Sequence, residues 1–331
     1  MTFKYNNVYV ENTSTIAGPY EKKGPLGDKF DKTFNNLYYG EKSWEMAETK
    51  VLEDTVELLL NKTKKSASDI DVLISGDLTN QIAASCYASY KYQIPFLGIY
   101  TACSTSVEGI ILGSSLIDSG KINRAIASVS SHNMVSEKQF RNPTEYGAPK
   151  PRTATFTATG GASIMLTNEK TDVKVESSTI GKIVDMNQKD PLNMGAVMAG
   201  AAADTIYRHL KDMNRSVSDY DLILTGDLGK CGKEILKEYM MEEYKIDLSN
   251  NYNDCGVMLY DLEKQKECLA GGSGPVCSAL VNYSLIYEKL KKKELKRVLL
   301  VATGALFSPT FVFQHNNILS IANVVSLEVV E

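Results

Sequence analysis

Cys103 is the residue of this sequence best placed to do chemistry. It lies in the run TACSTSV at 101–107, after an apolar segment at 95–100 that predicts a strand and before an apolar segment that predicts a helix. A cysteine at such an elbow meets the unpaired N–H groups and the positive dipole end of the helix, which favour the thiolate, its nucleophilic form. The sequence predicts a reactive thiol here, and the alternative is a thiol packed in the core.

Polar residues also follow the strand expected at 124–131. His132 ends that strand, which neighbours the strand before Cys103, and Asn133 comes next. Because ligands of α/β sheets bind at the carboxyl ends of strands, we expect this pair to line a site. The loop beyond could supply cations for a carboxylate and rings to cover a flat ligand, with a solvated charged loop as the alternative. The candidate cations are Lys138, Arg141, Lys150 and Arg152, and the candidate rings are Phe140, Tyr146 and Phe156.

The elements that must position these residues occur twice. Residues 68–78 (SDIDVLISGDL) match residues 218–228 (SDYDLILTGDL) at six of eleven positions, 150 residues apart. A second pair, 121–128 and 294–301, matches at an offset of 173. Each segment of the first pair is a short apolar run typical of a buried parallel strand. We therefore predict an α/β protein made of two duplicated halves, 1–172 and 173–331.

Helical patterns fill the spaces between these strands. Apolar residues at helical spacing predict a helix at about 43–64. The helix after Cys103 is apolar nearly all round, so it is predicted to be buried and to meet its counterpart from the other half in the centre.

Composition excludes several classes of function. The chain has 331 residues and a net charge of −4, so it lacks the basic field that draws proteins to nucleic acid. It has no signal-like start and no run of about 20 apolar residues, so we expect an intracellular protein without a transmembrane segment. The six cysteines form no C-x-x-C pair and no metal or other cofactor is expected. The basic run KLKKKELK at 289–296 suits a helix end, with contact to anionic lipid as the alternative.

The sequence resembles the thiolase and ketosynthase superfamily through its ACSTS elbow, the Gly-rich buried helix after it and the duplicated halves. Over the whole chain it resembles more closely the stage V sporulation protein AD family. That resemblance rests on residues 18–19, 24–27 and 42–45, on SSHN at 130–133, and on residues 137–141, 143–147 and 153–155.

The resemblance implies a fold of two βαβαβαββ halves in a five-layered αβαβα arrangement. It also implies a protein that binds dipicolinic acid during its uptake into developing bacterial endospores. The implied partners are the other proteins of the stage V sporulation A membrane channel, with a possible homodimer and a peripheral location at the forespore inner membrane. Cys103 would then be the positional equivalent of the superfamily nucleophile.

One departure from the enzyme pattern decides the predicted function. Condensing enzymes need His or Asn in two second-half loops to polarise the acyl carbonyl. The matching loops here, 225–229 and 270–275, contain neither. We therefore predict a non-catalytic binding protein, with an active acyltransferase using Cys103 as the alternative.

The predicted ligand site surrounds the inherited elbow. The N–H groups of Ser104 and Thr105 are expected to receive one carboxylate of the ligand, and Lys138 and Arg141 the other. The ring is expected to fill the space near Gly226 and Gly272, in the loops that lack histidine, and Asp227 is a further candidate ligand-binding residue there.

Overall fold

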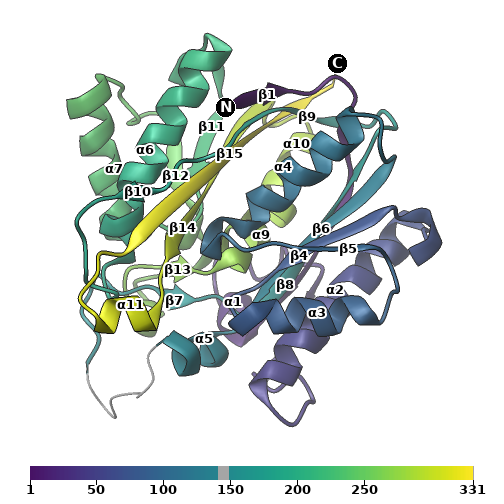
Figure 1. Ribbon diagram of the computed structural model, residues 1–331, viewed down its shortest axis with the longest axis horizontal. Coiled ribbons are helices and arrows are strands. Elements are labelled where there is room, and N and C mark those ends of the chain that lie inside the picture. Colours follow the sequence, from purple (N-terminus) through teal and green to yellow (C-terminus); the bar gives the residue numbers. More distant parts are fainter. Residues whose placement is uncertain (141–148, 331) are drawn as a thin grey trace.

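The computed structural model describes residues 1–140 and 149–330 (Figure 1). Its strands are β1 Thr2–Lys4, β2 Tyr9–Ala17, β3 Lys32–Thr33, β4 Val72–Gly76, β5 Phe96–Gly98, β6 Arg124–Ser131, β7 Phe156–Thr157, β8 Gly160–Thr167, β9 Val173–Thr179, β10 Val184–Asp185, β11 Leu222–Thr225, β12 Tyr252–Asp254, β13 Gly272–Ser273, β14 Arg297–Leu306 and β15 Leu319–Val329. Its α-helices are α1 Pro19–Lys22, α2 Trp44–Thr63, α3 Ala83–Tyr90, α4 Thr105–Asp118, α5 Asn133–Phe140, α6 Met194–Met213, α7 Gly229–Tyr244, α8 Cys255–Leu259, α9 Pro275–Val281, α10 Tyr287–Lys291 and α11 Pro309–Phe313.

The order of the strands in the main sheet repeats itself in reverse. From one end to the other it runs β12-β11-β14-β15-β9 and then β2-β8-β6-β4-β5. In both halves a parallel pair (β4–β6, β11–β14) is followed by an antiparallel pair (β6–β8, β14–β15). In the main sheet the two orders meet where β2 lies beside β9 at one residue pair, Tyr9 with Lys174, and β1 also pairs with β9. The predicted duplication is therefore visible in the strand order.

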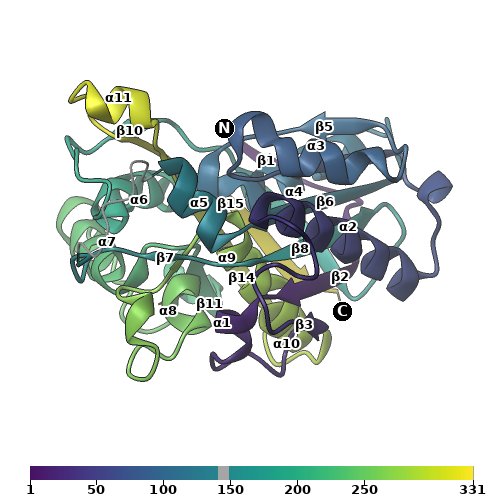
Figure 2. The same ribbon diagram turned by 90° about the horizontal axis from the view of Figure 1, so that it is seen from below.

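The helices form three layers around the two half-sheets. α2 packs on β2 and β8, α6 packs on β14 and β15, and α4 and α9 lie between the half-sheets. Figure 2 shows α2 and α3 on one side, α6 and α7 on the other, and α4 and α9 in the middle. This is the expected five-layered αβαβα arrangement. Because α4 is covered on both sides, Val107, Ile110 and Ile111 are all nearly inaccessible to solvent, as its apolar sequence predicts.

Both halves use the same local device at the start of their central strand. Ser66 and Asp69 form a capping box before β4, and Ser216 and Asp219 form the same box before β11. The SD-x-D repeats of the sequence are thus two copies of one turn.

No helix of the described residues is both long and apolar enough to cross a membrane.

Candidate functional site

The elbow that carries Cys103 is a single 3-10 turn, Ala102–Ser104, between β5 and α4. Ala102 has a φ of 51°, in the left-handed region that an alanine seldom adopts. The second half holds this turn in place. Ser104 Oγ donates to the carbonyl of Ala302 on β14 at 2.8 Å, and a Cβ on Gly304 would lie only 2.3 Å from the Thr101 carbonyl oxygen. The strained turn is therefore maintained by tertiary contacts from β14.

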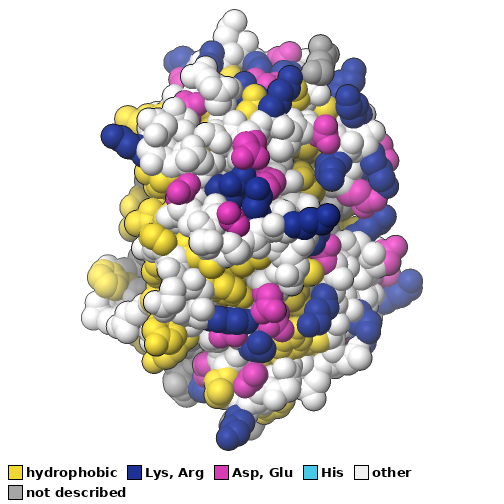
Figure 3. Space-filling view, turned by 90° about the vertical axis from the view of Figure 1, so that its right-hand side faces the viewer, with side chains coloured by type: hydrophobic (Ala, Val, Ile, Leu, Met, Phe, Trp, Pro, Cys, Tyr) yellow, Lys and Arg dark blue, Asp and Glu magenta, His cyan; other side chains and the backbone are white. Residues whose placement is uncertain are grey.

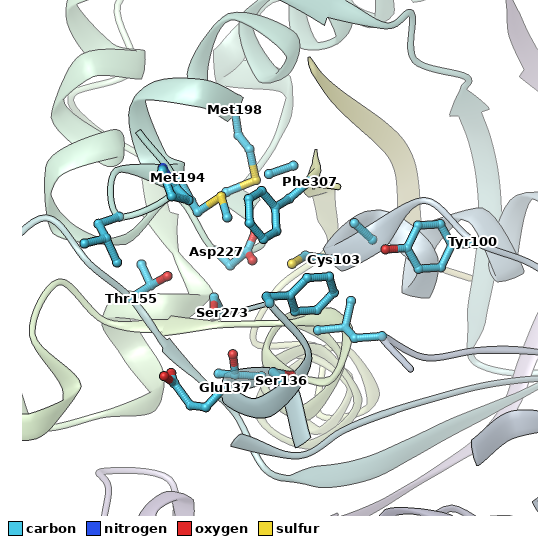
Figure 4. A pocket seen from close by; sticks show the side chains of 17 residues that line it. Tyr100, Cys103, Ser136, Glu137, Thr155, Met194, Met198, Asp227, Ser273 and Phe307 are labelled. Atoms are coloured by element: carbon cyan, nitrogen blue, oxygen red, sulfur yellow. The ribbon is translucent and has the colours of Figure 1, made fainter. Parts of the chain in front are cut away.

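The carboxyl group of Asp227 faces the Cys103 thiol from the loop after β11. Asp227 is 2% exposed, and its carboxylate accepts hydrogen bonds from Thr303 Oγ1 at 2.6 Å and from the Gly274 N–H at 3.2 Å. The thiol lies beside this carboxyl group, close enough for the two to interact electrostatically. Figure 4 shows the two side chains beside each other at the base of a pocket.

The pairing of Cys103 with Asp227 contradicts the prediction of a reactive thiol with a lowered pKa. Burial, reinforced by the negative charge of Asp227, raises the pKa of Cys103 well above its usual value. The helix N-terminus was expected to lower it, but a like-signed charge in a dry site outweighs a helix dipole worth about 1 kcal/mol. Burial also raises the pKa of Asp227 to about 7. Cys103 is thus held as a neutral thiol.

A pocket with a cavity of about 100 Å³ opens above this pair. Its walls are mostly apolar and come from both halves: Tyr100 and Phe140 from the first, Met194, Met198 and Phe307 from the second. The Phe140 and Phe307 rings pack against each other, with centroids 5.4 Å apart. Aromatic and thioether side chains are well suited to enclose a flat ring.

Four hydroxyl groups line the same pocket without a hydrogen-bond partner in the described part of the chain. They belong to Ser136, Thr155, Thr157 and Ser273. None of these oxygens is sealed from solvent, so the hydroxyls are open to the cavity and can donate to a ligand that accepts hydrogen bonds.

The charge of the pocket differs from the prediction. Over residues 1–140 and 149–330, no Lys, Arg or His lines it, whereas Asp227 and Glu137 do. A cation lies beside the pocket: Lys150 forms an ion pair with the lining residue Glu137, with Nζ 2.9 Å from Oε1. Lys150 is one of the basic residues that the sequence offered for a carboxylate.

The prediction that His132 and Asn133 line the site is wrong. His132 follows β6 as expected, but its ring is buried away from the pocket. Its Nε2 lies 2.9 Å from the Leu37 carbonyl oxygen and its Nδ1 accepts from the Met134 N–H, so both nitrogens are engaged. Burial lowers the pKa of His132. Asn133 begins α5, and its backbone N–H donates to Thr159 Oγ1.

The N–H groups of Ser104 and Thr105 are not available to a carboxylate either. They donate to the carbonyl oxygens of Thr101 and Ala102 inside the elbow. Their side chains are buried and bond to Ala302 and Ala102. A 3-10 turn at the start of a helix consumes the donors that a direct strand-to-helix transition leaves free.

The predicted basic residues do not come together at the pocket. Lys138 forms an ion pair with Glu45 at 2.5 Å and is absent from the pocket lining. Arg141 and Tyr146 lie outside the described residues. Of the predicted rings, Phe140 lines the pocket, whereas Phe156 packs against Tyr20 and Tyr260.

Gly272 was expected to leave room for the ring, but it belongs to the core. A Cβ there would lie 2.8 Å from Cys277 Sγ and 3.1 Å from the Tyr260 ring. Its neighbour Ser273 faces the pocket instead. Successive residues of β13 point to opposite sides, so the prediction was one residue out of register.

Sequence reasoning missed the two methionines and Phe307. Met194 and Met198 are four residues apart on α6, a spacing typical of a core face, and Phe307 follows a long buried strand. No local signal distinguishes a pocket wall from a core position, because both are apolar.

The fold is thiolase-like. A crystal structure of a variant of Xanthomonas campestris OleA matches with a TM-score of 0.62 and 13% identity, covering 98% of this chain and 99% of that one. A 3-oxoacyl-[acyl-carrier-protein] synthase III from Aquifex aeolicus matches with a TM-score of 0.59 and 12% identity, covering 97% and 99%.

Sequence similarity gives the narrower group. The family described as stage V sporulation protein AD matches residues 1–328. Stage V sporulation protein AD of Bacillus subtilis is 46% identical over 321 residues, 97% of this chain and 94% of that protein. The chain belongs to the stage V sporulation protein AD family.

Proposed function

We propose that this chain is a non-catalytic binding protein for dipicolinic acid that serves the uptake of dipicolinate into developing endospores. The observation that carries the proposal is the set of four unpartnered hydroxyls, within the described residues, above a neutral thiol. Membership of a sporulation family supports the biological setting.

The Cys103–Asp227 pair supports the absence of catalysis. Acyl transfer by a cysteine needs the thiolate, which a neighbouring general base or cation stabilises. Here burial, together with the carboxylate beside the thiol, raises the pKa of Cys103. The inherited nucleophile is therefore poorly suited to attack a thioester.

The size and walls of the pocket support a single-ring ligand. The cavity measures about 100 Å³, less than the volume of about 150 Å³ of a cavity that holds benzene, so a ring with two carboxylates would fill it and extend beyond it. It adjoins a more open groove through Tyr100, Phe140 and Phe307, which leaves room for ring substituents but not for a long acyl chain inside.

The carboxylates of dipicolinate would accept hydrogen bonds from the four hydroxyl groups of the pocket. Each hydroxyl can donate one hydrogen bond, worth about 1.5–3 kcal/mol when the acceptor is charged. Lys150 at the rim supplies positive charge through its contact with Glu137. Protonation of Asp227 removes a repelling charge from the base of the pocket.

Calorimetric titration tests the proposal. We expect dipicolinate to bind, and pyridine, which lacks both carboxylates, to bind at least 100-fold more weakly. Thr157→Val and Ser273→Ala remove hydroxyls with little change of shape and should weaken dipicolinate binding about tenfold each. Ser68→Ala, an exposed hydroxyl far from the pocket, is the matched control.

Unchanged affinity in both pocket variants would place the ligand elsewhere. Failure of the unaltered protein to bind dipicolinate at all would refute the proposed ligand.

An acyltransferase is the second candidate function, because Cys103 remains at the base of a pocket in a fold shared with a 3-oxoacyl synthase. It requires that malonyl or acyl thioesters turn over and that Cys103→Ala abolishes this turnover. We expect no turnover above that of the variant.

The proposal extends to partners. The setting implies the membrane channel proteins of stage V sporulation and a peripheral location at the forespore membrane. A homodimer is favoured by the end of the sheet, where β5 has no further neighbour among the described strands and Leu97, Tyr87 and Tyr90 are 43%, 74% and 78% exposed. Tyr90→Lys together with Leu97→Lys should give a monomer in sedimentation analysis, and an unchanged sedimentation coefficient of a dimer would exclude this interface.

A further inference from the structure

A second concave feature lies at the opposite end of the central strands from the Cys103 pocket. β14 begins at this groove with Arg297 and ends near the pocket, where Ala305 and Phe307 form part of the wall. Ten residues of strand span roughly 30 Å. The groove measures about 880 Å³ and lies at the end of the molecule where Figure 1 places both chain termini.

Four segments build this groove, and most of its charged side chains are basic. The turn between β8 and β9 contributes Lys170, and the segment between α10 and β14 contributes Lys293 and Lys296. The lining also includes Tyr9, Lys174, Arg297, Glu328, Val329 and Val330.

The strand register explains how the cations come together. Tyr9, Lys174, Glu328 and Arg297 are direct neighbours in a row across β2, β9, β15 and β14. Directly opposed residues lie on the same face of a sheet, so this row forms the floor of the groove.

The charges of the groove are not balanced internally. Arg297 pairs with Glu328 at 2.9 Å and with Glu176 at 3.5 Å. Lys170, Lys174, Lys293 and Lys296 have no ion pair with any residue in 1–140 or 149–330. The groove therefore presents four positive charges that these parts of the chain leave uncompensated.

This imbalance is local. The side of the molecule in Figure 3 carries Lys and Arg interspersed with Asp and Glu. Even in the basic run at 289–296, Lys292 pairs with Glu288 and Lys291 lies over the Tyr287 ring. The two lysines of that run that line the groove have no such partner in the described ranges. Like charges that converge without compensation destabilise a fold, which favours an anionic partner for them.

We propose that this groove, lined by Lys170, Lys174, Lys293 and Lys296, binds an acidic polypeptide segment of a partner protein. A narrow acidic segment can reach the bottom of a concave site and meet all four lysines, which a flat bilayer cannot. Peripheral membrane sites add exposed apolar side chains to their basic residues. The strongly exposed large hydrophobic residues in the described ranges, among them Tyr87, Phe311 and Phe313, do not line this groove.

The test measures binding of fluorescein-labelled hexaglutamate by anisotropy at low and moderate salt. We expect binding that weakens steeply with added salt, because the contacts are charge pairs open to solvent. The double variant Lys174→Glu/Lys296→Glu should weaken it at least tenfold. A matched reversal of two lysines that also lack ion pairs in the described ranges, Lys64→Glu/Lys121→Glu, should change it less than twofold.

Two further arms complete the experiment. Labelled hexaglutamine reports affinity that does not depend on charge, and vesicles of phosphatidylglycerol and phosphatidylcholine report affinity for a membrane surface. Equal weakening by both double variants would overturn the proposal, as would vesicle binding that depends on the groove lysines without binding of hexaglutamate. Circular dichroism of each variant verifies the fold, and dipicolinate binding at the distant pocket should be unchanged.

Discussion

Asp77 and Asp227 occupy the same position of the internal repeat, in SGDL and TGDL, yet they do different things. Asp77 accepts hydrogen bonds from the Thr79 N–H at 2.7 Å, the Thr79 hydroxyl and the Ser85 N–H at 2.7 Å. All three donors come from its own loop and the helix that follows. Asp77 is a structural acceptor that organises the turn between β4 and α3.

In the second half another residue does this work. Asp254, at the end of β12, accepts from the Leu228 and Gly229 N–H groups at 2.9 and 3.0 Å. These are the donors of the loop that carries Asp227. Because Asp254 satisfies them, Asp227 is free to turn towards Thr303, Gly274 and the Cys103 thiol. One duplicated aspartate thus became a pocket residue because a neighbour took over its local role.

The largest difference between the two aspartates should appear in stability. Asp77→Ala leaves the Thr79 and Ser85 N–H groups buried without an acceptor, which should cost about 3–5 kcal/mol of unfolding free energy. Urea denaturation measures this cost. Asp227→Ala should cost clearly less, because removal of its charge also relieves an unfavourable burial. Equal losses would mean that both aspartates are structural.

The second largest difference between Asp77 and Asp227 should appear in the pH dependence of the unfolding free energy. Asp227 has a native pKa of about 7, above the value of about 3.9 in an unfolded chain. Between these values the native state holds a proton that the unfolded state has lost, so stability falls as pH rises from about 4 to 7. Asp227→Asn should reduce the loss between pH 5 and pH 8 by about 2 kcal/mol.

Other buried carboxyl groups affect that comparison, since burial also raises the pKa values of Glu108 and Asp254. Burial likewise raises the pKa of Glu21 to about 7 and that of Glu48 well above its usual value. The quantity to compare is therefore the change relative to the unaltered protein, with Asp77→Asn as the control. An identical pH profile for Asp227→Asn would contradict the assigned environment.

Thiol reactivity gives a third, smaller difference. Asp227→Asn removes the negative charge beside Cys103, so the pKa of the thiol should fall and its alkylation by iodoacetamide at pH 7.5 should accelerate about tenfold. Asp77→Asn should leave the rate within twofold. Mass mapping measures the labelling, with the exposed Cys86 as an internal reference. A rate unaffected by Asp227→Asn would show that access, not charge, protects Cys103.

The smallest expected effect concerns the ligand. Dipicolinate carries negative charge, so its affinity should fall severalfold between pH 6 and pH 8 as Asp227 loses its proton. In Asp227→Asn this dependence should largely disappear, whereas Asp77→Asn should retain it. Titration calorimetry at both pH values provides the measurement, and a pH dependence that persists in Asp227→Asn would assign it to another group.

The sequence by itself determined the architecture. The repeat at 68–78 and 218–228, the helical pattern at 43–64 and the apolar helix after Cys103 predicted two α/β halves with a buried centre. β4, β11, α2 and α4 lie where these patterns placed them. Such patterns are reliable because burial of one face imposes a period of two on a strand and 3.6 on a helix, whatever the distant contacts are.

The tertiary structure alone decided the site. Cys103 and Asp227 were both named from the sequence, but their meeting, and the neutral thiol that results, depends on β14, β13 and α9 closing around them. His132 and Gly272 were assigned to the pocket by their place in the chain, and both are packed against other residues. A shift of one position along a strand moves a side chain from the pocket to the core. The pKa of a side chain depends on the burial and the charges that distant segments supply. The direction in which a side chain points and its pKa both depend on contacts throughout the fold, so no local sequence pattern predicts them.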